Sequence, residues 1–161
     1  MREPIETLVP RMQNRLYRAA FSVCRDRQEA ENITQDVFLM YHHSAKEFES
    51  RDHLDAWLLR AAINRAKDVC RSFWRRNRQS LEEIADPIPF ETREDRGVFL
   101  AVMGLKEKQR IPIYLFYYED RSIQDIARVL RLPENTVKSR LRRGRMELKT
   151  ILQEDWRDDE P

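Results

Sequence analysis

The sequence predicts an all-α protein made of two small helical domains, joined by a flexible acidic linker. Apolar residues recur at intervals of three and four through most of the chain, which is the spacing of one helical face. Only 3 of the 161 residues are glycine, too few for the many tight turns of a β-sandwich or barrel. Between the two helical blocks, residues 79–97 are polar, contain two prolines and lack this periodicity. Together these observations set the fold class and the domain boundaries.

The first block, residues 1–78, contains three expected helices. Apolar side chains share one face over residues 5–24, which indicates the first helix. Asp26 is followed three residues later by a glutamate, a pattern that resembles a capping box and opens the second helix. Asp52 is expected to cap the third helix, in which Trp57 is in register with apolar neighbours.

The second block, residues 98–152, contains four expected helices. A short one runs from the start of the block to near Gly104, and the next covers residues 106–118. Ser122, followed three residues later by an aspartate, is expected to cap a third. Pro133 suits the first position of the last helix, because proline needs no backbone N–H there.

The formal net charge of +2 hides an uneven distribution along the chain. It is +4 over residues 1–78, −4 over the linker, +6 over residues 98–152 and −4 over an acidic tail, residues 153–161. Basic blocks favour a polyanionic partner, although surface helices are also basic for solubility. No apolar run approaches the roughly 18 residues that cross a bilayer, so a cytoplasmic protein is expected.

Several kinds of chemical site are not expected. Cys24 and Cys70 lie far apart in the sequence, so the prediction is two separate buried thiols rather than a metal-binding or redox pair. His42 and His43 lack a third metal ligand at suitable spacing. The sequence has neither a P-loop nor an H-E-x-x-H motif, and its carboxylates are scattered. We therefore expect no metal, no cofactor and no enzymatic activity.

The strongest local motif is SIQDIARVLRLPENTVKSRLRRGRMEL, residues 122–148. Its two apolar faces, separated by a short turn, predict a helix-turn-helix, whose second helix enters the major groove of DNA. The alternative is a plain helical hairpin with a solvated basic face. Residues 138–149 hold six cations and one anion, more positive charge than solubility requires, which favours DNA binding.

The N-terminal block carries a resemblance to a known family. QEAENITQDVFLMY, residues 28–41, and FESRDHLDAWLLRAAINRAKDVCRSFWRR, residues 48–76, resemble domain 2 of bacterial sigma factors. Followed by the helix-turn-helix, the order resembles the extracytoplasmic-function (ECF, group IV) sigma factors. The resemblance implies an alternative sigma factor that directs core RNA polymerase to specific promoters and promotes DNA melting. It also implies an anti-sigma factor, often membrane-anchored, and no catalytic activity.

The resemblance also implies roles for individual residues. The surface that docks on the clamp helices of the β′ subunit would comprise Asn32, Gln35, Asp36, Phe38 and Tyr41. The loop that captures a flipped minus-10 base would comprise Phe48, Glu49, Ser50, Arg51, Asp52 and His53, with Trp57, Arg60, Asn64, Arg65 and Asp68 beside that element. Contacts to the minus-35 bases and phosphates would come from Asn135, Thr136, Lys138, Ser139, Arg140, Arg142, Arg143 and Arg145.

Several positions depart from the family pattern, among them Asn135, which replaces a common glycine. Asn32 stands where the family usually has an acidic residue, so one charge facing the polymerase is lost. Residues 49–51 contain no glycine where the loop usually has one. Arg131 replaces the glycine of a Leu-Gly pair in the turn, and a left-handed conformation there would cost on the order of 1 kcal/mol.

Other interpretations remain open at this level. By its register alone, Trp57 favours core packing, and Phe38 fits the core and a polymerase contact equally well. Gln35 and Asp36 also fit an ordinary solvated face. For the whole chain, the alternative is a stand-alone helix-turn-helix repressor that binds its operator without polymerase. A degenerate sigma relative that serves as an adaptor is the third possibility.

Overall fold

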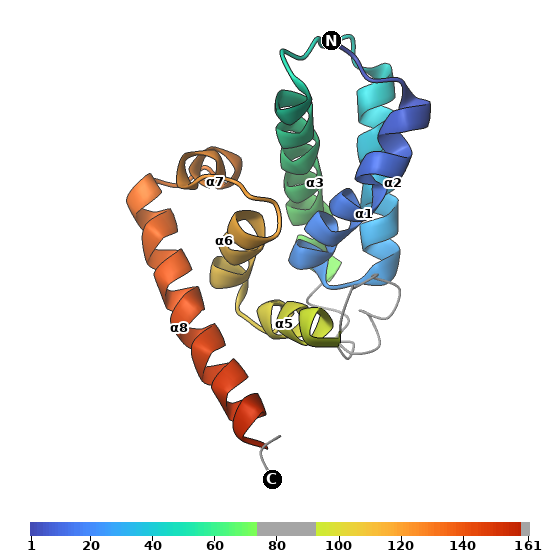
Figure 1. Cartoon of the computed structure of the whole chain (residues 1–161). Helices are drawn as coiled ribbons and strands as arrows, with labels where there is room; N and C mark the ends of the chain where they lie inside the picture. Colours follow the sequence, from blue (N-terminus) through green and yellow to red (C-terminus); the bar gives the residue numbers. More distant parts are fainter. Residues whose placement is uncertain (74–92, 159–161) are drawn as a thin grey trace. The chain divides into compact units, whose positions relative to one another are not determined.

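The computed structural model describes residues 1–73 and 93–158 (Figure 1). These described residues form seven helices and no strand, which confirms the prediction of an all-α protein. The chain divides into two compact units, residues 1–80 and 81–161, and each is described by itself. Most of the expected linker, residues 79–92, and the end of the acidic tail, residues 159–161, lie outside the described residues.

Unit 1 (residues 1–80) is a bundle of three helices. These are α1 (Ile5–Cys24), α2 (Arg27–His43) and α3 (Arg51–Phe73), and each packs on the other two (Figure 1). The core is built from the apolar stripes that the sequence shows. Its largest fully buried side chains are Leu8, Met12, Leu16, Phe21, Ile33, Leu54, Leu58, Leu59 and Ile63. Their burial removes apolar surface from water and supplies most of the stabilisation of the bundle.

The helix starts in unit 1 follow local capping chemistry. The Asp26 side chain accepts a hydrogen bond from the Glu29 backbone N–H at 2.9 Å, as predicted. The predicted cap of the third helix is wrong. The Ser50 hydroxyl oxygen accepts from the His53 N–H at 3.1 Å, and α3 begins one residue before Asp52. Asp52 therefore lies in the first turn, where its carboxylate still faces the positive end of the helix.

Unit 2 (residues 81–161) contains α5 (Arg93–Met103), α6 (Glu107–Tyr117), α7 (Ile123–Leu130) and α8 (Glu134–Asp158). The long helix α8 contacts the other three helices (Figure 1). Helix α5 begins five residues before the expected start of the second block, and α8 continues beyond its expected end. Buried apolar side chains at the centre of the unit include Phe99, Tyr114, Ile126, Val137 and Leu141.

The turn between α7 and α8 is short, as predicted, but α8 begins at Glu134, one residue after Pro133, which was expected to be its first residue. Ser122 caps α7 by accepting from the Asp125 N–H at 3.0 Å. Arg131 ends α7 in the left-handed conformation, with φ 57°, as its position in the turn suggests. The Leu132 N–H then donates to the Ala127 carbonyl at 3.0 Å and closes the turn. This connection sets the angle at which α8 leaves α7.

Gly144 allows α8 to lie close to α6. A Cβ atom at this position would lie 2.7 Å from Cγ1 of Ile113 and 3.4 Å from Cβ of Gln109. The distance to Ile113 is shorter than an ordinary van der Waals contact, so a larger residue would require the Ile113 side chain or the two helices to shift, whereas the distance to Gln109 is an ordinary contact. The glycine thus serves packing, and it has a negative φ, unlike Arg131.

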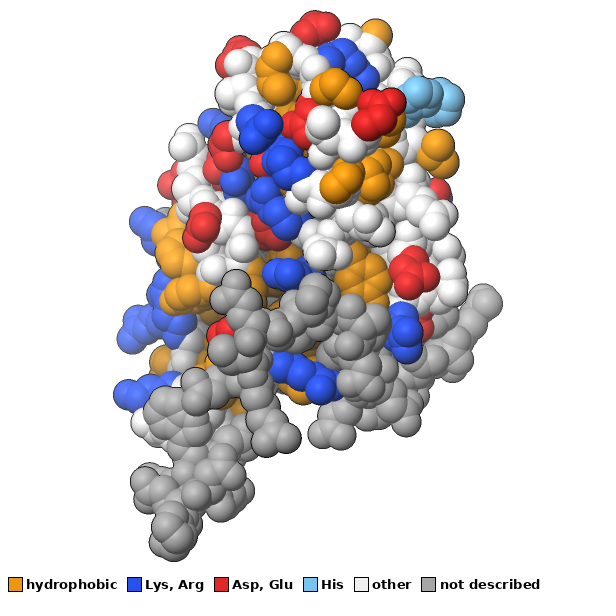
Figure 2. Space-filling view, turned by 45° about the vertical axis from the view of Figure 1, so that its right-hand side comes forward, with side chains coloured by type: hydrophobic (Ala, Val, Ile, Leu, Met, Phe, Trp, Pro, Cys, Tyr) orange, Lys and Arg blue, Asp and Glu red, His pale blue; other side chains and the backbone are white. Residues whose placement is uncertain are grey.

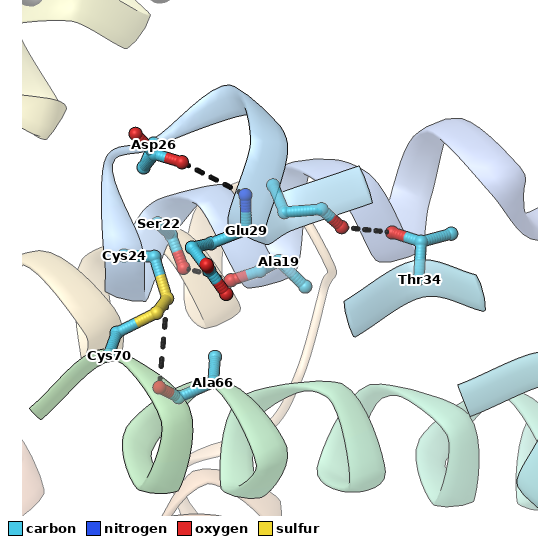
Figure 3. Close-up of a disulfide and its surroundings, with 9 residues drawn as sticks. Ala19, Ser22, Cys24, Asp26, Glu29, Thr34, Ala66 and Cys70 are labelled. Atoms are coloured by element: carbon cyan, nitrogen blue, oxygen red, sulfur yellow. Dashed lines mark hydrogen bonds between the residues drawn. A yellow bond between two sulfur atoms is a disulfide. The ribbon is translucent and has the colours of Figure 1, made fainter. Parts of the chain in front are cut away.

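The two cysteines form a disulfide, which corrects the prediction of separate thiols. Cys24 is the last residue of α1 and Cys70 lies near the end of α3, with their Cα atoms 5.4 Å apart (Figure 3). Both side chains are buried, and Cys24 Sγ lies 3.6 Å from the Ala66 carbonyl oxygen. The sequence separation of 46 residues concealed the pair, because only the packing of α1 on α3 brings these helix ends together.

Candidate nucleic-acid interface

Helix α8 presents a basic face to solvent. Lys138, Ser139, Arg142 and Arg143 are exposed, and so is Asn135 at the start of the helix. Residues three and four apart lie on the same side of a helix, so these side chains form one stripe. The opposite face is buried through Val137, Leu141 and Gly144. The stripe can donate hydrogen bonds to base edges and phosphates, as a recognition helix does.

Three other predicted DNA-binding residues are partly buried or held by contacts within the unit. Thr136 and Arg140 are half-buried at the edge of the packed face of α8. Arg145 is exposed, but its Nε donates a hydrogen bond to the Tyr117 hydroxyl at 2.5 Å. Its guanidinium also lies over the rings of Phe116 and Tyr117, at 5.5 and 5.7 Å. Contact with α6 therefore holds Arg145 in one place while leaving other N–H groups for a phosphate.

Unit 1 contains a surface hollow of about 350 Å³ between the end of α2 and one side of α3. Trp57 is half-buried in its wall, with Met40 and Lys46 on the α2 side. The structure brings four of the predicted minus-10 residues together in the hollow: Arg60, Asn64, Arg65 and Asp68. An aromatic wall with cations and an amide around it can stack on a base and bind its edge and backbone.

The loop of residues 44–50 leads into this hollow from the end of α2. Phe48 is only 2% exposed, and its ring lies 5.3 to 6.1 Å from those of Tyr41, His53 and Trp57. Phe48 belongs to the predicted minus-10 loop, but its ring is packed in the core rather than exposed. The rings of Tyr41, His53 and Trp57 surround that of Phe48, and this aromatic cluster supports the loop. The neighbouring Glu49, Ser50, Arg51 and Asp52 are exposed, and His53 is half-buried.

The predicted polymerase-binding residues divide into exposed and buried ones. Asn32 and Gln35 are exposed, whereas Asp36 and Phe38 are half-buried. Arg65 Nε lies 3.4 Å from Oδ2 of Asp36 and links α3 to this face. Tyr41 differs from the prediction, because it is 2% exposed and its hydroxyl donates to the Glu3 carbonyl at 2.6 Å. Tyr41 is therefore a core residue and does not present its side chain to a partner.

Sequence reasoning missed two exposed apolar residues on α2. Leu39 is 55% exposed and Met40 is 46% exposed, next to the buried Tyr41. Hydrophobic side chains reach the surface among basic and acidic ones on the face that Figure 2 shows. The available signal was helical phase: the buried stripe of α2 runs through Ile33, Val37 and Tyr41 in steps of four residues, and Leu39 and Met40 lie outside it. Exposed apolar area of this kind can contribute to a protein-binding surface.

A buried ion-pair network holds the start of α3 to α1. Arg11 donates to Asp55 at 2.8 Å and to Glu3 at 2.9 Å, and Arg15 donates to Asp55 at 3.1 Å. Glu3 and Asp55 are buried, so their charges require these partners. The hydrogen bond that Arg11 donates to Asp55 is the main cause that raises the pKa of Arg11 above its ordinary value, against the opposing effect of burial. The network fixes the helix that lines the hollow.

Within residues 1–73 and 93–158, no three histidine, cysteine or acidic side chains are arranged to hold a metal ion. No helix in the same residues has the length and apolar character required to cross a membrane.

Comparison with known proteins identifies the family. A model of Sigma-70 region 2 matches residues 8–78, and a model of Sigma-70 region 4 matches residues 98–148. The ECF RNA polymerase sigma factor SigM of Mycobacterium tuberculosis is 30% identical, covering 94% of this chain and 78% of its own length. The chain belongs to the ECF sigma factors. SigX of Bacillus subtilis, another sigma factor of this family, is 26% identical over 99% of this chain and 91% of its own length.

Two solved structures have the fold of this sigma factor. CnrH, in complex with the cytosolic domain of CnrY, has a TM-score of 0.66 and 26% identity, covering 94% of this chain and 88% of its own. RpoE of Bartonella quintana, in complex with the anti-sigma factor NepR, has a TM-score of 0.70 and 22% identity, covering 92% and 96%. The second likeness shows the fold alone.

Family membership relates the basic stripe of α8 and the surface of unit 1 to transcription initiation. The sigma factor is an alternative initiation factor that acts with RNA polymerase at promoters, and initiation factors of this kind are not enzymes. The region 4 match covers the basic stripe of α8, and the region 2 match covers the hollow and the exposed face of α2. A stand-alone repressor is not favoured, because both halves of the chain match sigma regions in the expected order.

Proposed function

We propose that the two units divide promoter recognition between them. Residues 1–78 bind core polymerase and the minus-10 element, and residues 98–152 bind the minus-35 element. Residues 79–97 connect these domains, and residues 153–161 form an acidic tail. The observation that carries this proposal is the exposed basic stripe of α8, which stands on a buried apolar face and so has a fixed orientation.

In the minus-35 complex, the stripe enters the major groove. Arg142 and Lys138 are exposed and can reach guanine edges, with Ser139 and Arg143 beside them. Arg140, Thr136 and Arg145 lie toward the sides of the helix and contact phosphates. Phosphate contacts position the helix, while the base contacts select the sequence.

In the minus-10 complex, the hollow of unit 1 receives an unstacked base. Unstacking costs a few kcal/mol, which stacking and hydrogen bonds in the pocket must offset. Trp57 supplies an aromatic surface, Asn64 an amide, and Arg60 and Arg65 positive charge. Phe48 contributes from the core by supporting Trp57, at a centroid distance of 5.6 Å.

Helix α2 supplies the surface for core polymerase. Asn32, Gln35 and Asp36 offer polar groups, while Phe38 and Leu39 offer apolar area for the clamp helices of the β′ subunit. A binding surface of this mixed character is typical of non-obligate protein partners. Working on core polymerase would place the protein in the cytoplasm.

We also infer regulation by an anti-sigma factor, often a membrane-anchored protein in this family. Of the two structural neighbours, the RpoE protein is in complex with the anti-sigma factor NepR, and CnrH is in complex with the cytosolic domain of CnrY. An inhibitor that covers the exposed Leu39 and Met40 would compete with polymerase for α2.

The decisive experiment uses the full chain, purified core polymerase and genomic DNA fragments. We expect specific transcripts only when both proteins are present, and weak duplex binding by the chain alone. Tight, symmetric binding to duplex DNA without polymerase, together with no affinity for core enzyme, would support the repressor instead. Binding to core without any promoter-directed transcript would indicate the adaptor.

A second experiment assigns the polymerase contact. A tagged piece with residues 1–80, which forms a compact unit, should retain core polymerase in a pull-down. A piece with residues 98–161 should not retain it. Retention by the C-terminal piece alone would overturn the assignment.

A further inference from the structure

The first three residues of the chain run along the loop of residues 44–50. Met1 and Phe48 exchange two backbone hydrogen bonds: the Met1 nitrogen donates to the Phe48 carbonyl at 2.6 Å, and the Phe48 N–H donates to the Met1 carbonyl at 3.2 Å. Two residues that exchange both bonds form the pairing of adjacent antiparallel strands. We call residues 1–3 the N-terminal strap.

Arg2 makes the central contacts of the strap. Its Nη1 donates to the Lys46 carbonyl at 2.7 Å, and its Nη2 donates to the Tyr41 carbonyl at 2.9 Å. The guanidinium also lies over the Tyr41 ring, 4.4 Å from the centroid. One planar side chain thus joins the middle of the loop to the end of α2.

The Tyr41 carbonyl belongs to the last turn of α2, where it also accepts from the Ser44 N–H at 3.2 Å, so Arg2 supplies it with a second donor. A cation at this end also complements the negative end of the helix dipole. Arg2 therefore has a well-defined position. Because Arg2 donates to the Lys46 carbonyl, the Lys46 backbone is held in place as well. A lysine in its place could reach only one of the two carbonyls with comparable geometry, because it lacks the planar fork.

Glu3 anchors the other end of the strap. It is buried, its carboxylate accepts from Arg11, and its carbonyl accepts from the Tyr41 hydroxyl. The strap is consequently attached to the ion-pair network at one end and to Phe48 at the other. Between these two anchors, Arg2 is half-buried and holds the loop.

The loop that Arg2 holds contributes to the hollow. Lys46 lies in its wall, and its Nζ is 5.8 Å from the centre of the Phe48 ring. Phe48 in turn packs on Trp57, the aromatic wall. A shift of the Lys46 backbone would therefore move the rim of the hollow and disturb the packing beneath Trp57.

We propose that Arg2 is a positioning residue for the selection of the minus-10 base: by joining the Lys46 and Tyr41 carbonyls, it sets the loop that borders the hollow. This inference rests on the proposed function of the hollow. Arg2 does not touch the base, so its effect reaches DNA through Lys46 and the aromatic cluster. The minus-35 contacts lie in the other unit and are independent of it.

The test compares full-length wild type, Arg2→Ala and Arg2→Lys in transcription with core polymerase. Arg27→Ala is the matched control, because Arg27 is an exposed arginine at the opposite end of α2 and contacts neither the loop nor the strap. Two ratios are measured for each protein. One is the transcript yield from preferred over substituted bases at the minus-10 element, and the other is the same ratio at the minus-35 element.

For Arg2→Ala, we expect the minus-10 ratio to fall by about tenfold, the effect of losing roughly one charge-assisted hydrogen bond of positioning. The minus-35 ratio should stay within about twofold, and Arg2→Lys should give an intermediate minus-10 ratio. Arg27→Ala should match wild type in both. Each ratio is independent of the fraction of active protein, so partial unfolding does not imitate the effect.

Two results would overturn the inference: an unchanged minus-10 ratio in both Arg2 variants, or an equal fall in both ratios. If Arg2→Ala is inactive, the ratio for Arg2→Lys decides in the same way. If the proposed function of the hollow is itself wrong, the result is distinguishable. Wild type would then produce no promoter-directed transcript or would show no base preference at minus-10.

Discussion

Reduction of the Cys24–Cys70 disulfide is expected to lower the free energy of unfolding of unit 1 by about 4 kcal/mol. The bridge spans 46 residues of sequence. In the chain-entropy model, closing a loop of this length removes about 4 kcal/mol of conformational freedom from the unfolded chain at 25 °C. Once reduced, the buried Cys24 thiol can donate to the Ala66 carbonyl, 3.6 Å away. A thiol is a weak donor, so this bond offsets only a fraction of the loss.

Chemical denaturation with and without dithiothreitol, followed by circular dichroism, measures this difference. Both cysteines of the chain are in unit 1, so unfolding of unit 2 serves as an internal reference. The double variant with Cys24→Ala and Cys70→Ala is the matched control, and dithiothreitol should leave its stability unchanged. Equal stability of oxidised and reduced wild type would refute the reasoning, as would two titratable thiols in the native, non-reduced protein.

Four further perturbations test the packing of unit 2, its basic face and Tyr17 of unit 1. Gly144→Ala should destabilise unit 2 by about 1–3 kcal/mol in a denaturation experiment, because its Cβ would meet Ile113. Arg142→Ala should cost roughly 1–3 kcal/mol in promoter binding and relax the choice of one minus-35 base, whereas Arg140→Ala should weaken binding to all sequences alike and reduce the salt slope by about one. Burial raises the pKa of Tyr17 to about 12, so the native state keeps a proton that the unfolded state releases near pH 10. Stability should therefore fall as pH rises from about 10 to 12, and Tyr17→Phe should remove that part of the decline.

The parts of the fold that sequence reasoning predicted well are those with local causes. Asp26 and Ser122 cap their helices because a side-chain oxygen reaches an N–H three residues ahead. Arg131 takes the left-handed conformation because the chain must reverse within a short turn. Each depends on residues that are adjacent in the sequence. The basic stripe of α8 was predictable for a similar reason, since helical phase alone separates it from Val137 and Leu141.

The features that sequence reasoning missed depend on contacts between distant residues. The Cys24–Cys70 pair forms because α1 and α3 end side by side, which no local pattern encodes. Arg2 has no neighbour in sequence that hints at its two acceptors, Tyr41 and Lys46. In both cases the signal exists only after the helices have packed.

For the aromatic residues near the hollow, the exposure of each side chain in the structure changes the role that we assign to it. Tyr41 and Phe48 resemble contact residues in the family pattern, yet both are almost fully buried. A buried ring cannot stack on an incoming base without leaving the core, at a cost of about 1.5–3 kcal/mol for exposing such a side chain. Trp57, which register assigns to the core, is half-buried and lines the hollow instead. In the proposed minus-10 complex the stacking surface is therefore Trp57, and the rings of Phe48 and Tyr41 pack behind it.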